Sequence, residues 1–216
     1  MDVDLLLLPY VSAHRDERMG AGPNALVAGG LHSRLEQRGH CVHRVVSIEP
    51  PAESWRAEIR TAFELAAALT TAVRATRDAG RFPLVLTGNC GPAALGTMAA
   101  LPDGTPVLWA DEHGDFNTPE TTTGGFLDGM ALATLTGRCW TQLARAQIPG
   151  HMPVAEEHVW LLGARDLDPA EADALRHSAI NRIAADATMG ASCVRRASIA
   201  VRSSAVRSFG ALGASR

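Results

Sequence analysis

The stretch PVLWADEHGD, residues 106–115, joins a short apolar run to a dense polar one. The apolar part, 106–110, lacks strict alternation of polar and apolar side chains, which is typical of a strand that helices cover on both faces. The same character predicts four further strands, at 2–8, 41–48, 84–87 and 158–163. Because covered strands of this kind belong to parallel sheets, the stretch indicates an α/β fold.

Segments with helical periodicity lie between these runs. The clearest covers about 54–78, where apolar and small side chains recur every three or four residues and Gly80 supplies a C-terminal stop. Further helices are predicted at about 24–38, 92–101 and 127–136. The alternation predicts a doubly wound, mostly parallel sheet between helical layers. Such sheets bind ligands beyond the carboxyl ends of their strands, here in the loops after Leu86, Ala110 and Leu162.

Composition narrows the function classes. The 216 residues carry 20 basic and 23 acidic side chains, a formal charge of −3, which disfavours a nucleic-acid-binding protein. No apolar run approaches the roughly 20 residues of a membrane-spanning helix, so we expect a cytoplasmic protein without a membrane partner. All the basic residues are arginines, which excludes lysine-dependent chemistry, and the four cysteines form no CxxC pair.

The chain changes character near residue 178. Residues 178–216 are rich in Ala, Ser and Arg and contain Asp186 as their only acid, whereas residues 1–177 are acidic overall. We therefore expect one α/β domain over 1–177 and a divergent tail over 178–216, either disordered or partly helical. The tail is interpreted as a native extension or as the product of a truncation or frameshift in the gene.

Three potential metal ligands alternate directly after the run 106–110. In an extended backbone Asp111, His113 and Asp115 would point the same way, while Glu112 would face elsewhere. Two carboxylates and an imidazole suit Mn, Zn or Fe. The alternative is that these residues are helix caps and ion-paired loop residues. The loop that follows is dense in small hydrogen-bonding side chains, which favours a site for a small polar ligand.

Four segments carry a family resemblance. The segment DEHGDFNTPETTTGGFLDGM, residues 111–130, resembles the ureohydrolase family, which includes arginase, agmatinase and formiminoglutamase. The other three occur in the family's order: RMGAGPNALVAGGL at 18–31, TGNCGPAALG at 87–96 and GARDLDPAE at 163–171. The resemblance covers about residues 1–177 and identifies the chain as a member of this family.

The resemblance implies a three-layer α/β/α sandwich of the arginase/deacetylase type with two Mn²⁺ ions and a bridging hydroxide. The implied reaction is hydrolysis of a C–N bond in a small guanidino or linear-amidine substrate, and the implied assembly is a homotrimer or homohexamer. By resemblance Asp111, His113 and Asp115 are metal ligands, with Asp111 bridging and Asp115 also catalytic. Asn117 and Thr122 match the loop that binds the substrate.

The sequence departs from the family pattern at two site positions. Cys90 replaces a family histidine ligand, and a thiolate shifts metal preference from Mn toward Zn or Fe. The alternative for Cys90 is a small buried packing residue. Asp128 stands where arginases have a histidine that transfers protons, so we assign it as catalytic. Its alternative role is to cap the helix that it opens.

The family's last two metal ligands come from an S-x-D-x-D-x-x-DP segment, which is absent beyond residue 168. We interpret the nearest candidates, 2–4 and 166–169, as structural. The fold is therefore expected to be C-terminally incomplete, with one metal ion or none.

Three interpretations of function follow from these observations. The first is a metal-dependent hydrolase by ancestry, with the activity of this form left open. The second is a non-catalytic ligand-binding or regulatory homologue. The third makes Cys90 a covalent nucleophile with His113 as its base.

Overall fold

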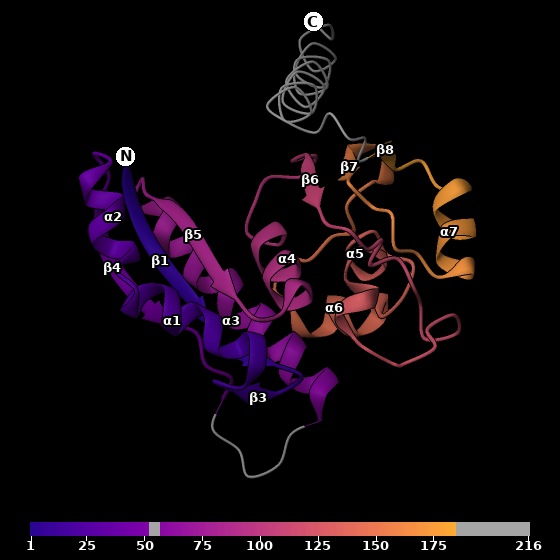
Figure 1. The fold of residues 1–216 in the computed structure, drawn as a ribbon, viewed down its shortest axis with the longest axis horizontal. Coiled ribbons are helices and arrows are strands. Elements are labelled where there is room, and N and C mark those ends of the chain that lie inside the picture. The colour runs from indigo at the N-terminus through magenta and orange to yellow at the C-terminus, as the bar shows by residue number, and fades with distance from the viewer. Residues whose placement is uncertain (52–56, 185–216) are drawn as a thin grey trace, which may run out of the picture. The chain divides into compact units, whose positions relative to one another are not determined.

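The computed structural model describes residues 1–51 and 57–184. Within it the chain divides into two compact units (Figure 1). Of the described residues, unit 1 contains 1–51, 57–101 and 140–152, and unit 2 contains 102–139 and 153–184. Among the helices of the described ranges, none has both the length and the hydropathy that a membrane crossing requires.

Unit 1 is built on a three-stranded parallel sheet in the order β4-β1-β5. These strands are β1 (Asp2–Leu8), β4 (Cys41–Ser47) and β5 (Phe82–Thr87). A short antiparallel pair, β2 (Tyr10–Val11) and β3 (His14–Arg15), follows β1. The helices are η1 (Arg18–Ala21), α1 (Gly22–Ala28), α2 (Leu31–Gln37), α3 (Glu58–Asp78), α4 (Cys90–Met98) and α6 (Thr141–Gln147).

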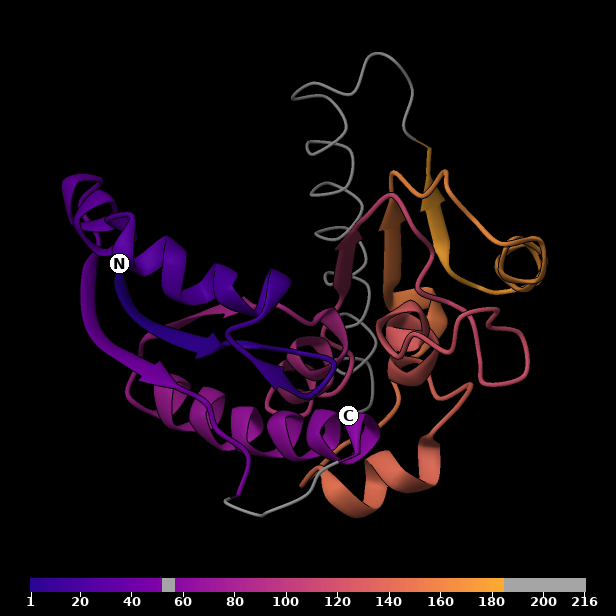
Figure 2. The same cartoon turned by 60° about the horizontal axis from the view of Figure 1, so that its bottom comes forward.

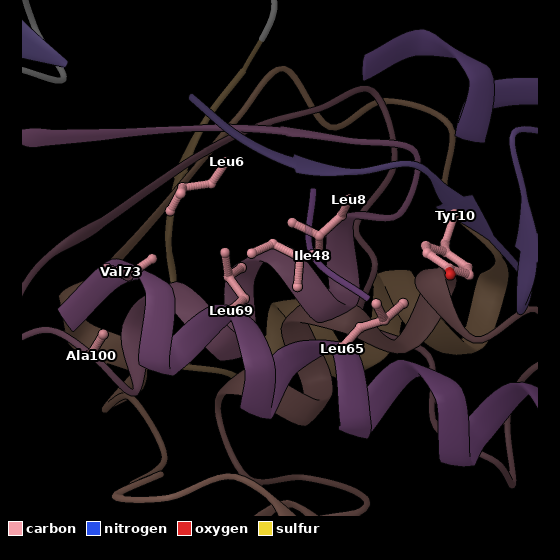
Figure 3. Packing of buried hydrophobic residues seen from close by; sticks show 8 residues of the cluster. All are labelled: Leu6, Leu8, Tyr10, Ile48, Leu65, Leu69, Val73 and Ala100. Atoms are coloured by element: carbon pink, nitrogen blue, oxygen red, sulfur yellow. The ribbon is translucent and has the colours of Figure 1, made fainter. Parts of the chain in front are cut away.

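Strand β1 is buried on both faces because its leucine run supplies apolar side chains to two helical layers. Leu6 and Leu8 pack in a cluster with Leu65, Leu69 and Val73 of α3 (Figure 3). The alternate residues of β1 pack against side chains of α1 and α2 on the opposite face, so the sheet lies between two layers of helices (Figure 2). Burial on both faces thus explains why polar and apolar side chains do not alternate in residues 2–8, as the sequence indicated.

Unit 2 contains a second three-stranded parallel sheet, in the order β6-β7-β8. The strands are β6 (Val107–Ala110), β7 (Val159–Leu162) and β8 (Asn181–Ile183). The helices are η2 (Asp128–Met130), α5 (Ala131–Leu135), η3 (Glu156–His158) and α7 (Pro169–Arg176). All four residues of β7, the central strand, are buried.

The strands and helices predicted from the sequence are present, and most of them, though not β1, have shifted boundaries. The predicted helix 24–38 is two helices, because Gly30 adopts a left-handed φ of +88° between α1 and α2. Of the predicted tail 178–216, the described part includes β8, which pairs with β7. The expectation of disorder or helix for residues 185–216 lies outside the described residues, and the domain boundary at 177 stays a prediction.

The carboxylate of Asp4 is fully buried and ion-paired inside unit 1. Its Oδ2 accepts hydrogen bonds from Arg44 Nη2 at 2.6 Å and from Thr76 Oγ1 at 2.9 Å, and Arg81 Nε lies 2.9 Å from Oδ1. Burial alone would raise the pKa of Asp4, but these three donors together lower it. Asp4 therefore acts as a structural counter-ion between β1, β4 and α3, as the sequence interpretation of 2–4 expected for this residue.

Replacing Asp4 by Asn should lower the free energy of unfolding at pH 7 by about 2–3 kcal/mol. This is less than the cost of breaking a fully buried ion pair, because the Arg44 side chain reaches solvent. Folding lowers the pKa of Asp4, so its ion pairs contribute their full stability at pH values above the pKa of Asp4 in the unfolded chain. This stability is lost as the pH falls through the pKa of Asp4 in the folded chain. Urea unfolding at pH 7 and near pH 3 should thus show a difference that shrinks in acid. Asp103→Asn, at an exposed position, is the control; an equal loss at both pH values would contradict the role of the charge.

Candidate functional site

The polar loop after β6 is bent rather than extended. Asp111 Oδ1 accepts hydrogen bonds from the backbone N–H of His113 at 3.0 Å and lies 3.1 Å from His113 Nδ1. Asp115 adopts a left-handed φ of +49°. The expectation of an extended segment with alternating side chains is therefore wrong, because the aspartate side chain bonds to the backbone two residues on and turns the chain.

Glu112 also departs from expectation. It was expected to face away from His113, yet its Oε1 lies 4.0 Å from His113 Nε2. Its other oxygen accepts a hydrogen bond from Arg165 Nη2 at 2.6 Å. Arg165 and Asp166 also donate their backbone N–H groups to the Glu112 carbonyl, at 2.8 and 3.0 Å. Glu112 thus ties the loop after β6 to the loop after β7.

Asp115 is the most perturbed acid of this loop. Its side chain is buried, and Oδ2 accepts a hydrogen bond from Trp109 Nε1 at 3.2 Å. Burial raises the pKa of Asp115 to about 7, with a further contribution from the neighbouring carboxylates of Asp111 and Asp128. The backbone carbonyl of Asp115 accepts N–H groups at the start of α5. A cationic partner would stabilise the ionised form of a carboxylate in this environment.

A pocket of about 380 Å³ opens beside Asp115. Four of the residues singled out from the sequence line it: His113, Asp115, Asn117 and Thr122. The remaining lining residues are Thr123, Gly124, Phe126, Gly129, Asp166, Asp168 and Glu171. The pocket therefore combines four acidic side chains with a histidine and small polar groups.

Hydrogen bonds already order the loop predicted to hold the substrate. Asn117 is buried, donates from Nδ2 to Asp168 Oδ2 at 3.0 Å and accepts at Oδ1 from Thr121 Oγ1 at 2.9 Å. Thr122 Oγ1 accepts the backbone N–H of Gly125 at 3.1 Å. These contacts hold the two predicted substrate residues on the pocket wall.

Three acids of the pocket, Asp166, Asp168 and Glu171, were not assigned to the site from the sequence. Asp168 precedes α7 as its N-cap, and Glu171, three residues later, accepts the Asp168 backbone N–H, which is half of a capping box. Glu171 is buried and also accepts the backbone N–H of Phe116 at 2.8 Å. Burial raises the pKa of Glu171. The sequence analysis assigned no helix here. The residues DPAE at 168–171 are typical of a helix start, but nothing in this pattern marks Asp168 and Glu171 as residues of a pocket wall.

Asp128 and Cys90 occupy the starts of helices in different units. Asp128 is buried and is the first residue of η2, where Leu127 rather than Asp128 takes the N-cap position, so the capping alternative is not supported. Cys90 is partly exposed as the first residue of α4, which disfavours its alternative as a buried packing residue. Cys90 lies in unit 1 and His113 in unit 2, so their pairing stays a prediction.

The conformation of the loop does not assemble a metal centre from its own ligands. Within residues 1–51 and 57–184, Asp111, His113 and Asp115 do not form a group whose ligand atoms all lie within 4.8 Å of one another. Asp111 and His113 are adjacent, whereas Asp115 is bonded to Trp109. The three residues have suitable donor chemistry for Mn²⁺, but their arrangement does not fit the ion.

The model of the arginase family matches residues 3–205, and the chain belongs to this family. Its members are ureohydrolases, which act on C–N bonds other than peptide bonds and typically bind Mn²⁺. The resemblance seen in the four sequence segments is thereby confirmed.

Individual relatives agree with this assignment. The chain is 33% identical over 171 residues to an arginase from Bacillus caldovelox and 34% identical over 168 residues to one from Brevibacillus brevis, covering 74% and 72% of this chain. Those matches cover 56% and 54% of the two relatives, so the chain spans little more than half their length. The solved structure of the Bacillus caldovelox arginase superposes with a TM-score of 0.72 at 30% identity, over 85% of this chain and 64% of that one. The α/β fold with parallel sheets is confirmed.

Proposed function

We propose that this chain is a hydrolase of a guanidino or related linear-amidine C–N bond, and that the acidic pocket of unit 2 binds the substrate. One observation carries the proposal: four carboxylates line one pocket, and two of them, those of Asp115 and Glu171, are buried. A guanidinium or amidinium group offers planar, charged N–H donors that match carboxylates. Family membership supports the choice of this class of cation.

The chain's own residues divide the task of recognition. Asp115 and Glu171, which are buried, and Asp168, which is partly exposed, would attract the cationic end of the substrate. A charged partner stabilises the two buried carboxylates most. Asn117 and Thr122 would bind the polar end of the substrate at the wall of the pocket. Asp128, buried near Asp115, is proposed to move protons during the reaction.

On the family resemblance, Asp111, His113, Asp115 and Cys90 are proposed as ligands of Mn²⁺, with Zn or Fe as alternatives, one ion being expected at most. The three loop residues do not converge in this conformation, so they would have to rearrange to bind the ion. The same observation favours a second candidate function, a ligand-binding homologue that recognises the guanidino compound without hydrolysing it.

Calorimetric titration separates the two candidates. Arginine and agmatine are titrated into the full chain with EDTA and with Mn²⁺, and urea is measured in parallel. Binding together with manganese-dependent urea release supports the hydrolase, binding without urea supports the ligand-binding homologue, and no binding under either condition would overturn both. The trimer or hexamer implied by the family is checked on the same samples by light scattering.

Replacing Asp168 by Asn should weaken binding of a guanidino ligand about tenfold, because it removes one pocket charge while the side-chain oxygen of Asn can still accept the hydrogen bond from Asn117. The matched control is Asp103→Asn, an exposed position outside the pocket. Equal affinities of the two variants would show that the pocket charge does not recognise the ligand. Circular dichroism of both variants verifies that α7 is retained.

A further inference from the structure

A second group of potential metal ligands lies in unit 1, apart from the pocket. Asp2, Cys41 and His43 each present one ligand atom, and these atoms all lie within 4.8 Å of one another. The residues come from the amino-terminal ends of β1 and β4, whereas the loops that carry the family's site residues follow the carboxyl ends of strands. All three residues are exposed, so an ion could reach them from solvent.

Strand pairing brings the three side chains together. Asp2 is the direct partner of Cys41 in the parallel pair β1–β4. The register then shifts between Val3 and Asp4: Val3 pairs with Val42 and Asp4 with Arg44, which leaves His43 as an extra residue on β4. A bulge of this kind re-aims a side chain, and His43 Nε2 lies 3.0 Å from Asp2 Oδ1.

The charges around the group are compatible with a cation. The N-terminal ammonium and the guanidinium of Arg81 act on Asp2 electrostatically, and Arg81, like Arg44, is ion-paired with the buried carboxylate of Asp4. Among the described contacts, the bonded partner of Asp2 is the His43 ring. The Asp2 side chain is exposed, so its carboxylate is open to an ion from solvent.

We propose that Asp2, Cys41 and His43 form a zinc site that cross-links the first strand to the edge strand beside it. A thiolate, an imidazole and a carboxylate are the three ligand types of protein-bound Zn²⁺, and the solvent-exposed fourth position takes a water molecule. The thiolate selects against Mn²⁺, Mg²⁺ and Ca²⁺, which prefer oxygen ligands. Binding releases the Cys41 proton and replaces the His43–Asp2 hydrogen bond with two bonds to the ion. This site is independent of the proposed hydrolase activity.

The test follows the reactivity of one thiol in the full chain. The rate of alkylation of Cys41 is measured by peptide mass mapping in EDTA, in Zn²⁺ and in Mn²⁺. Because the free thiolate is the nucleophile, Zn²⁺ should slow alkylation at Cys41 at least about tenfold, while Mn²⁺ should have no effect. Mapping the modified peptide separates protection at Cys41 from any metal binding at Cys90.

Two histidine variants decide whether the site is the proposed group or a single thiol. His43→Gln should raise the Zn²⁺ concentration that half-protects Cys41 by more than the roughly 10–100-fold loss of metal affinity that changes outside a ligand shell cause. His32→Gln, at a partly exposed position on α2 where His32 contacts Glu36, is the matched control and should leave protection unchanged. The proposal is overturned if Zn²⁺ does not protect Cys41, or if protection is the same in His43→Gln as in the unaltered chain.

Discussion

Gly96→Ala should lower the free energy of unfolding by about 3 kcal/mol, or prevent folding, because the substitution overpacks a helix contact. Gly96 lies in α4, where an added Cβ would stand 2.5 Å from the backbone oxygen of Ala66 and 2.9 Å from Leu69 Cβ, both in α3. Thr70 Oγ1 reinforces this approach by donating to the Gly96 carbonyl at 3.0 Å. The two helices would have to separate to admit one methyl group.

Gly22→Ala is the matched control for this substitution. Gly22 begins α1 with a helical φ of −56°, and an added Cβ there meets nothing within 4 Å. Alanine at Gly22 should therefore change stability by less than about 1 kcal/mol, because its better helix propensity is offset by contact of the new Cβ with the ring of Pro23. Urea unfolding of both variants measures the difference. Equal stabilities would show that α3 and α4 do not pack as closely as the structure places them.

Strand β1 was predictable because burial on both faces leaves no other pattern. Residues 2–8 form β1 with the predicted bounds, since six of its seven positions are buried between two layers of helices. Strand β8 was missed: in NRI at 181–183 two of the three side chains are exposed, so the segment carries no apolar run. Its pairing with β7 comes from tertiary contact rather than local sequence.

The candidate site was predictable in its members but not in its geometry. The resemblance selected His113, Asp115, Asn117 and Thr122, which line one pocket. The alternation argument failed because it assumed an extended backbone, whereas the aspartate at 111 bonds to the chain two residues later. The sequence also gave no sign that a helix cap after β7, Asp168, would face the same pocket, since that requires the loops after two neighbouring strands to meet.

Asp115→Asn should stabilise the fold at pH 8 and at the same time weaken binding of a guanidino ligand. The pKa of Asp115 is about 7 in the folded chain, above its unfolded value, because the carboxylate is buried and faces other acids. A raised acid pKa means that the folded state holds the proton more tightly, so stability falls as the pH rises toward 7 and stays low above it. Asn removes this charge and still accepts the Trp109 hydrogen bond through its side-chain oxygen.

The expected gain in unfolding free energy is roughly 1–3 kcal/mol at pH 8 in EDTA and close to zero at pH 4, where the carboxyl of the unaltered chain is also neutral. Thermal unfolding at the two pH values measures it. The same variant should bind arginine or agmatine at least about tenfold more weakly at pH 8, since one buried charge of the pocket is gone. A gain in stability without a loss of affinity would mean that the buried Asp115 carboxylate destabilises the fold and plays no part in ligand binding. Both effects together would show that this destabilising carboxylate serves ligand recognition.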